Sequence, residues 1–166
     1  IQRTKAIGLL HKQVRKDSAL SRQGIPDYLV TVRKLGENTE PVAGPFTEFA
    51  GENPPRKTGD PINDSINIWQ RYASPVWMDI DPSDTLQHRS AREQEDERHI
   101  CPLQLPLIER CVRLWSNKGD TVLSPFGGIG SEGYVSIQQG RKFIGCELKP
   151  SYWATGVENL KRAEYE

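Results

Sequence analysis

The chain has 166 residues and no net charge, with 22 Lys and Arg against 22 Asp and Glu. This length suits one domain or part of a larger one, and it is too short for two substantial cores. Charged residues make up 27% and hydrophobic residues 36%, a composition that argues against a disordered chain and against a membrane protein. Because the chain starts at Ile1 rather than Met, we expect a fragment or a processed product.

Charge and cysteine usage set further bounds. Residues 1–34 hold eight Lys and Arg and two Asp, a net charge of +6 that fits a polyanion partner and a solvated face equally well. Three Cys with apolar neighbours and no CxxC pair predict buried free thiols in a reducing compartment, so we expect a cytoplasmic protein. The three His lie far apart, which predicts no metal site, and no apolar stretch is long enough to span a membrane.

The first hundred residues contain few regular elements. Residues 27–33 are rich in β-branched and aromatic side chains and predict a strand. Residues 36–65 contain four of the 14 Gly and five of the 12 Pro and show no sustained period, so they predict a long loop, whereas residues 76–80 resemble a short strand. Residues 83–99 are strongly charged, and we expect them to be exposed.

From residue 101 onward the pattern is more regular. Helical spacing of apolar residues predicts a helix over 105–115, followed by a short buried strand over 121–124. Glycines at 127–130 predict a tight turn, with Ser131 capping a helix that ends at Gly140. A second strand is expected over 142–147, and Ser151 is expected to cap a final helix through Leu160. Residues 121–147 therefore form a β-loop-α-β unit.

This unit has the features of a nucleoside-type cofactor site. Glycines let a ligand approach the backbone, and the free N–H groups of a helix start favour anionic groups. Glu147, at the tip of the second strand and 19 residues after Gly128, is placed to accept both hydroxyls of a ribose. Residues 128–133 match G-x-G-x-x-G, so dinucleotides and S-adenosylmethionine are both open. Only 19 residues follow Glu147, which argues against an ordinary dehydrogenase.

Three segments in order carry a family resemblance: CPLQLP at 101–106, SPFGGIG at 124–130 and GCE at 145–147. The chain resembles the C-terminal portion of the β-class DNA amino-methyltransferases, in particular the phage- or prophage-type members, which methylate adenine N6 or cytosine N4. The resemblance implies an α/β fold, a Rossmann-like S-adenosylmethionine-dependent methyltransferase fold with permuted strand order, incomplete in this chain. It also implies three parts: later sheet strands at 1–35, a loop-rich insertion with the target-recognition region at 36–98, and the S-adenosylmethionine-binding portion at 99–166.

The same resemblance assigns site residues. Residues 102–105 would border the methionine end of the cofactor, residues 124–130 would wrap its amino-acid moiety, and Glu147 would hold the ribose. Ser124 stands where the family usually has Asp, which removes a charge that could pair with the cofactor's ammonium. The cofactor-binding residues implied are Pro102, Leu103, Gln104, Ser124, Pro125, Phe126, Gly127, Gly128, Gly130 and Glu147.

The family also needs a tetrad of the form (D/S/N)PP(Y/F/W), which binds the target amino group and stacks on the flipped base. The one look-alike in the sequence is SPVW at 74–77, in which Val76 replaces the second proline, so Ser74, Pro75 and Trp77 are weak catalytic candidates. We expect the true tetrad to lie upstream of Ile1. We accordingly expect this chain alone to be marginally stable and catalytically inactive.

Double-stranded DNA is the partner that the resemblance implies, as in restriction-modification, and neither a metal nor a membrane is expected. Arg89 and Arg92 are candidates for DNA contact, although a solvated charged face explains them as well. Two other functions stay open: a fragment of an NAD(P)-type dinucleotide-binding oxidoreductase, and a non-catalytic DNA-binding remnant of a methyltransferase.

Overall fold

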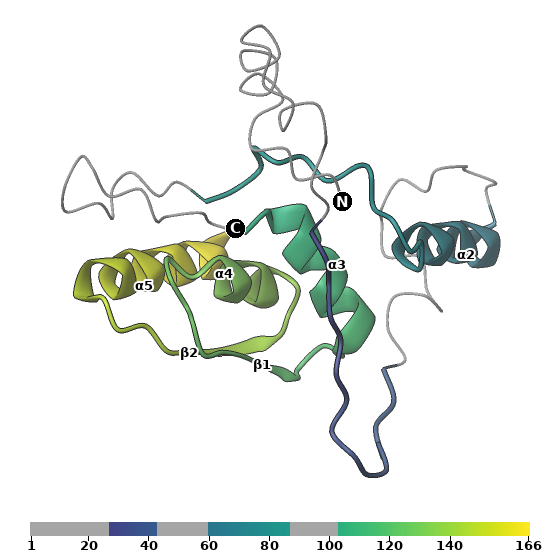
Figure 1. Cartoon of the computed structure of the whole chain (residues 1–166), viewed down its shortest axis with the longest axis horizontal. Coiled ribbons are helices and arrows are strands. Elements are labelled where there is room, and N and C mark those ends of the chain that lie inside the picture. The colour runs from purple at the N-terminus through teal and green to yellow at the C-terminus, as the bar shows by residue number, and fades with distance from the viewer. Residues whose placement is uncertain (1–26, 43–59, 87–102) are drawn as a thin grey trace, which may run out of the picture.

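The structure is a computed structural model that describes residues 27–42, 60–86 and 103–166 (Figure 1). Within these ranges it contains four helices and two short strands. In chain order they are α2 (Pro61–Tyr72), α3 (Leu105–Trp115), β1 (Thr121–Ser124), α4 (Ser131–Gln138), β2 (Lys142–Gly145) and α5 (Pro150–Tyr165).

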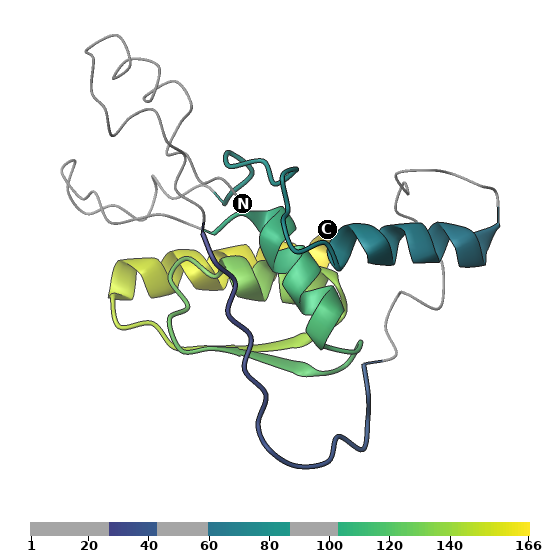
Figure 2. The same cartoon turned by 45° about the vertical axis from the view of Figure 1, so that its right-hand side comes forward.

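The two strands form a parallel pair joined by α4. Their register runs from Thr121 opposite Lys142 to Ser124 opposite Gly145. Helix α4 packs against α3, α5 and both strands, and α4 and α5 lie together on one face of the pair (Figure 2). The predicted β-loop-α-β unit and the α/β class are therefore confirmed, with β2 ending two residues before Glu147.

The core lies between the three helices and the covered face of the strands. Its buried members come from the segment after α2, from α3, from the glycine turn, and from α4 and α5. They are Leu86, Ile108, Val112, Ile129, Tyr134, Val135 and Ala163. On the strands, Leu123 and Ile144 are 63% and 56% exposed, because neighbouring residues of a strand point to opposite faces. The prediction of a buried strand at 121–124 is wrong, since only Ser124 is buried.

Two predicted strands are absent from the described residues, and one predicted loop is partly helical. Residues 27–33 and 76–80 have no strand partner there, and Tyr28, Val30 and Val32 are at least 80% exposed. β-Branched residues suit a half-buried sheet, but a segment becomes a strand only when it pairs with a neighbouring strand. Helix α2 begins at Pro61, inside the loop predicted over 36–65, and buries Ile68 and Tyr72.

The helix ends differ from the predicted caps. Gly130, not Ser131, occupies the N-cap of α4, in a left-handed conformation with φ of +82°. Helix α4 ends at Gln138, with Gly140 beyond it at φ +77°. Helix α5 begins at Pro150 rather than after Ser151 and continues past Leu160 to Tyr165. Proline is favoured in a first helical turn, because its missing N–H has no partner to lose there.

A strap of residues 74–86 runs along α3 in the opposite direction. At one end, Trp77 lies beside a hollow that Leu114 and Trp115 also line. At the other, the backbone N–H of Leu105 donates to the carbonyl of Asp84 at 2.9 Å. The strap thereby connects α2 to α3.

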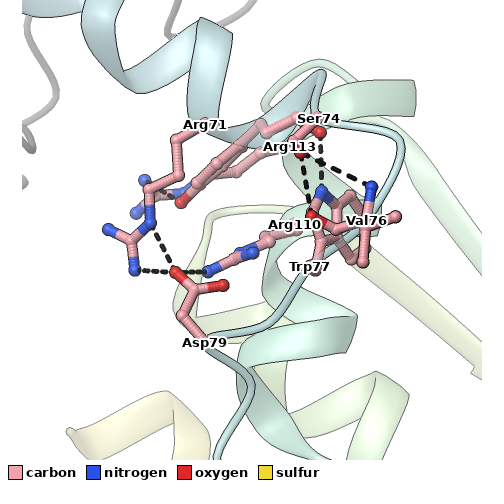
Figure 3. Close-up of polar contacts among 8 residues, drawn as sticks. Arg71, Ser74, Val76, Trp77, Asp79, Arg110 and Arg113 are labelled. Carbon is pink, nitrogen blue, oxygen red and sulfur yellow. Dashed lines mark hydrogen bonds and ion pairs between the residues drawn. The ribbon is translucent and has the colours of Figure 1, made fainter. Parts of the chain in front are cut away.

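Asp79 is the polar centre of this strap (Figure 3). Its Oδ2 accepts from Arg110 at 2.8 Å and from Arg71 Nε at 2.7 Å. The Arg110 side chain is only 4% exposed, and its guanidinium carbon lies 5.3 Å from the ring centroids of both Tyr72 and Trp77. Hydrogen bonds from Arg110, the strongest influence, and from Arg71 hold the pKa of Asp79 well below its usual range, although desolvation opposes them. A buried cation thus lies near the faces of two aromatic rings and is neutralised by one carboxylate.

Asp79→Asn should lower the free energy of unfolding by about 2 kcal/mol in urea denaturation. A hydrogen bond to a charged group contributes roughly 1.5–3 kcal/mol, and the 42% exposure of Asp79 keeps the effect away from the upper end. The matched control is Asp81→Asn, because Asp81 is exposed and its carboxylate accepts hydrogen bonds from the neighbouring Ser83. Equal stability of the two variants would contradict the role of Asp79.

The same contact predicts a pH dependence. A carboxyl group whose pKa is lowered by folding stabilises the fold above its unfolded pKa, about 3.9 for Asp, and this stabilisation is lost as pH falls toward the folded pKa. The stability difference between wild type and Asp79→Asn should therefore shrink on acidification below about pH 4. Urea denaturation at several pH values checks this, and a constant difference would refute it.

Within the described ranges, no helix combines the length and the apolar composition needed to cross a membrane.

Candidate cofactor-binding site

The glycine turn after β1 folds back onto the end of β2. The N–H of Gly127 donates to the carbonyl of Cys146 at 2.6 Å, and the N–H of Cys146 donates to the carbonyl of Ser124 at 2.9 Å. Within the turn, the N–H of Gly130 donates to the carbonyl of Gly127 at 2.8 Å. These bonds place the predicted residues 124–130 at the carboxyl ends of both strands, where ligands of parallel sheets bind.

Glycine is required at two positions of this turn. Gly128 and Gly130 have φ values of +53° and +82°, which side chains disfavour. A Cβ on Gly130 would lie 3.3 Å from the Cα of Gly156 in α5, whereas one on Gly128 would project into open space. Gly130 therefore serves close packing, and Gly128 leaves its backbone accessible to a ligand.

Glu147 ties the turn to the strand end. Its Oε2 accepts from the N–H of Gly128 at 2.7 Å, and its Oε1 accepts from the N–H of Lys149 at 2.8 Å. Each carboxylate oxygen has a further lone pair, so both oxygens can accept one more hydrogen bond. A carboxylate with two free acceptor positions beside an open glycine backbone fits a vicinal diol such as that of a ribose.

Helix α5 packs against the turn, a contact that the sequence patterns do not predict. Asn159 donates through Nδ2 to the carbonyl of Ile129 at 2.8 Å, and the Cα of Gly156 lies against the turn. A glycine in a helix interior lowers helix stability and signals close packing, so Gly156 was a readable clue.

A small cavity of about 70 Å³ beside the turn is lined by Glu147, Gly128 and Trp153 among others. Small-molecule sites usually enclose roughly 300 Å³ or more. The cavity is therefore too small to enclose a nucleoside, which would lie over the outer surface of the turn. The described residues form one side of such a site.

The segment before α3 adds the residues expected at the other end of the cofactor. Gln104 is buried and forms the N-cap of α3, where its carbonyl accepts the N–H groups of Leu107 and Ile108. Leu103 packs against the core cluster that contains Ile129 of the turn, and it shares a trough with Glu132 of α4. Leu103 and Gln104 are thus near the turn, while Pro102 lies outside the described residues.

The structure places Ser74, Pro75 and Trp77 away from the turn. They line a hollow of about 360 Å³ at the C-terminal end of α3. There, Arg141 donates to the carbonyl of Ser116 at 2.7 Å, so this end of α3 lies by the amino-terminal ends of the strands. The glycine turn leaves β1 at its carboxyl end, so the two groups lie at opposite ends of the sheet.

Their polar and aromatic groups are also engaged. Ser74 Oγ donates to the carbonyl of Val76 at 2.8 Å, and the buried indole N–H of Trp77 donates to the carbonyl of Tyr72 at 2.9 Å. The Trp77 ring stacks on Arg110 (Figure 3). We assign these residues to the packing of α2 and the strap on α3.

The remaining predictions concern thiols, metals and arginines. Cys111 and Cys146 are free, but Cys146 is exposed, so the prediction of a buried thiol is wrong there because Cys146 follows the end of β2. Burial raises the pKa of the Cys111 thiol to about 11. The described part of the chain contains no group of three His, Cys, Asp or Glu that could hold a metal ion. Arg89 and Arg92 lie outside the described residues.

A family model described as DNA methylase, of the N6 and N4 type, matches residues 12–158. The chain belongs to this DNA methylase family. Residues of the glycine turn and Glu147 lie within the match.

Individual members of the family share sequence with part of the chain. The Type II methyltransferase M.BamHI of Bacillus amyloliquefaciens is 41% identical over 75 residues, which cover 45% of this chain and 16% of that protein. The DNA adenine methyltransferase YhdJ of Escherichia coli K12 is 42% identical over 72 residues, which cover 42% of this chain and 24% of that protein. The chain thus matches less than a quarter of the length of these relatives.

A solved structure shows the same fold. TTHA0409 of Thermus thermophilus, described as a DNA modification methylase and solved in complex with S-adenosyl-L-methionine, has a TM-score of 0.51 and 24% identity. The alignment covers 84% of this chain and 48% of that one. The predicted α/β methyltransferase fold is confirmed.

Gly130→Ala should destabilise the chain more than Gly128→Ala. A side chain at either left-handed position costs roughly 1–2 kcal/mol, but only at Gly130 does the added Cβ also press on the backbone of Gly156. Thermal denaturation followed by circular dichroism measures both variants. Equal midpoints would show that α5 does not hold the turn closely.

Proposed function

We propose that this chain is the cofactor-binding portion of an S-adenosylmethionine-dependent DNA methyltransferase that modifies adenine N6 or cytosine N4. The observation that carries the proposal is the Glu147 carboxylate, held on the N–H of Gly128 within a glycine turn of a DNA methylase family member. The names of the relatives and the cofactor in the Thermus thermophilus complex support it.

The donor and acceptor set fits S-adenosylmethionine. Glu147 offers acceptors for the ribose hydroxyls, and Gly128 leaves room for backbone contact. The cofactor, when bound, supplies a methyl group on a sulfonium centre. The chain's own residues bind and orient it: Glu147 holds one end, and Pro102, Leu103 and Gln104 border the other, beside the turn of Ser124, Pro125, Phe126, Gly127, Gly128 and Gly130.

The DNA side of the proposal rests on the family. The partner is double-stranded DNA, contacted by a target-recognition region within 36–98 that includes Arg89 and Arg92. The division of the chain into parts at 1–35, 36–98 and 99–166 belongs to the same proposal. The proposed enzyme is cytoplasmic, is of the phage or prophage type, acts in restriction-modification and needs no metal.

Calorimetric titration of the chain separates this proposal from a dinucleotide-binding protein. S-adenosylhomocysteine should bind and NAD should not. Glu147→Gln should lower the affinity for S-adenosylhomocysteine by about tenfold or more, because a charge-assisted hydrogen bond contributes roughly 1.5–3 kcal/mol to binding.

The matched control is Glu164→Gln, which changes an exposed glutamate of α5. It should bind S-adenosylhomocysteine as tightly as the wild type. Binding of NAD in preference, or undiminished affinity of Glu147→Gln, would refute the proposed site.

A further inference from the structure

A second carboxyl group lies beside the glycine turn, and the roles above leave it unused. Glu132 is in the first turn of α4, two residues after Gly130. The side chain is partly buried, and desolvation raises the pKa of its carboxyl group. Among the residues that the structure describes, Glu132 has no ion-pair partner.

The surroundings of Glu132 are apolar. It borders a trough of about 380 Å³ between α3 and β1, and it is the one charged side chain among the described lining residues. The other members are Leu103, Ile108, Cys111, Val112, Trp115, Ser116, Thr121 and Val122. A carboxylate loses hydration in such a place, and the hydrogen bond of Glu132 to its own backbone N–H offsets only part of that loss. A cation beside it would offset the rest.

The proposed cofactor carries one suitable cation, the α-ammonium of its amino-acid end. Glu147 already accepts the N–H groups of Gly128 and Lys149 at the end of β2. Ser124, at the end of β1, is uncharged. Among the described residues that line this trough, which includes Leu103, Glu132 is therefore the available anion.

We propose that the Glu132 carboxylate binds the α-ammonium of S-adenosylmethionine and selects cofactors that carry an amino-acid end. The inference rests on the proposed function and divides the two acids between the two ends of one ligand. Glu147 takes the ribose, and Glu132 takes the ammonium.

Two ligands and two variants test this division by calorimetry on the full chain. S-adenosylhomocysteine carries the amino-acid end, and 5′-methylthioadenosine keeps the nucleoside but lacks that end. Glu132→Gln should lower the affinity for S-adenosylhomocysteine by about tenfold or more and leave the affinity for 5′-methylthioadenosine unchanged. Glu147→Gln should lower the affinity for both ligands. The control is Glu158→Gln, which changes an exposed residue paired with Lys161 and should lower neither affinity.

The outcomes are distinct. Unchanged affinity of Glu132→Gln for S-adenosylhomocysteine overturns the inference and leaves the proposed function standing. An equal loss for both ligands also overturns it, since it would show a structural role for Glu132. A wild-type chain that binds neither ligand overturns the proposed function itself, and the inference with it.

Discussion

The hydrogen bond from the Gly128 N–H to the Glu147 carboxylate fixes the shape of the candidate site. It joins the loop after β1 to the residue after β2, so the two elements form one surface. A charge-assisted bond of 2.7 Å is strong, and it leaves lone pairs on the carboxylate for a ligand. The same side chain therefore holds the loop in place and presents acceptors for hydroxyl groups.

Two contacts from α5 hold the turn on its other side. Asn159 donates to the carbonyl of Ile129, and the bare backbone of Gly156 lets the helix approach Gly130. The turn is thus clamped between a strand end and a helix. A site preorganised in this way loses little of its binding free energy to ordering the loop.

Local patterns predicted the second half of the chain well and the first half poorly. The glycine run, the flanking apolar segments and Glu147 lie within roughly 30 residues, and local rules suffice for such a unit. Residues 27–33 have strand-like composition, but a strand needs a partner that composition does not name. Helix α2 was missed because Pro and Gly around it indicated a loop, although Pro61 suits a helix start.

The candidate site shows the same limit. Glu147 and the glycines were predicted, because their spacing follows a known pattern. Glu132 follows Gly130 by two residues, but its apolar surroundings come from the packing of α3 beside β1, which no local pattern predicts. Asn159 is brought to the turn only by the packing of α5. The contact of Asp79 with Arg110 spans 31 residues, and no periodicity predicts it.

The central claim is that a nucleoside cofactor binds at the Glu147 and Gly128 contact. The most direct measurement is solution NMR of the ¹⁵N-labelled chain titrated with S-adenosylhomocysteine. The amide signals of Gly128 and Lys149, both donors to Glu147, should shift saturably, while that of Gly119 in the remote turn before β1 stays in place. Saturation of the chain without movement of the Gly128 and Lys149 amides would contradict the account.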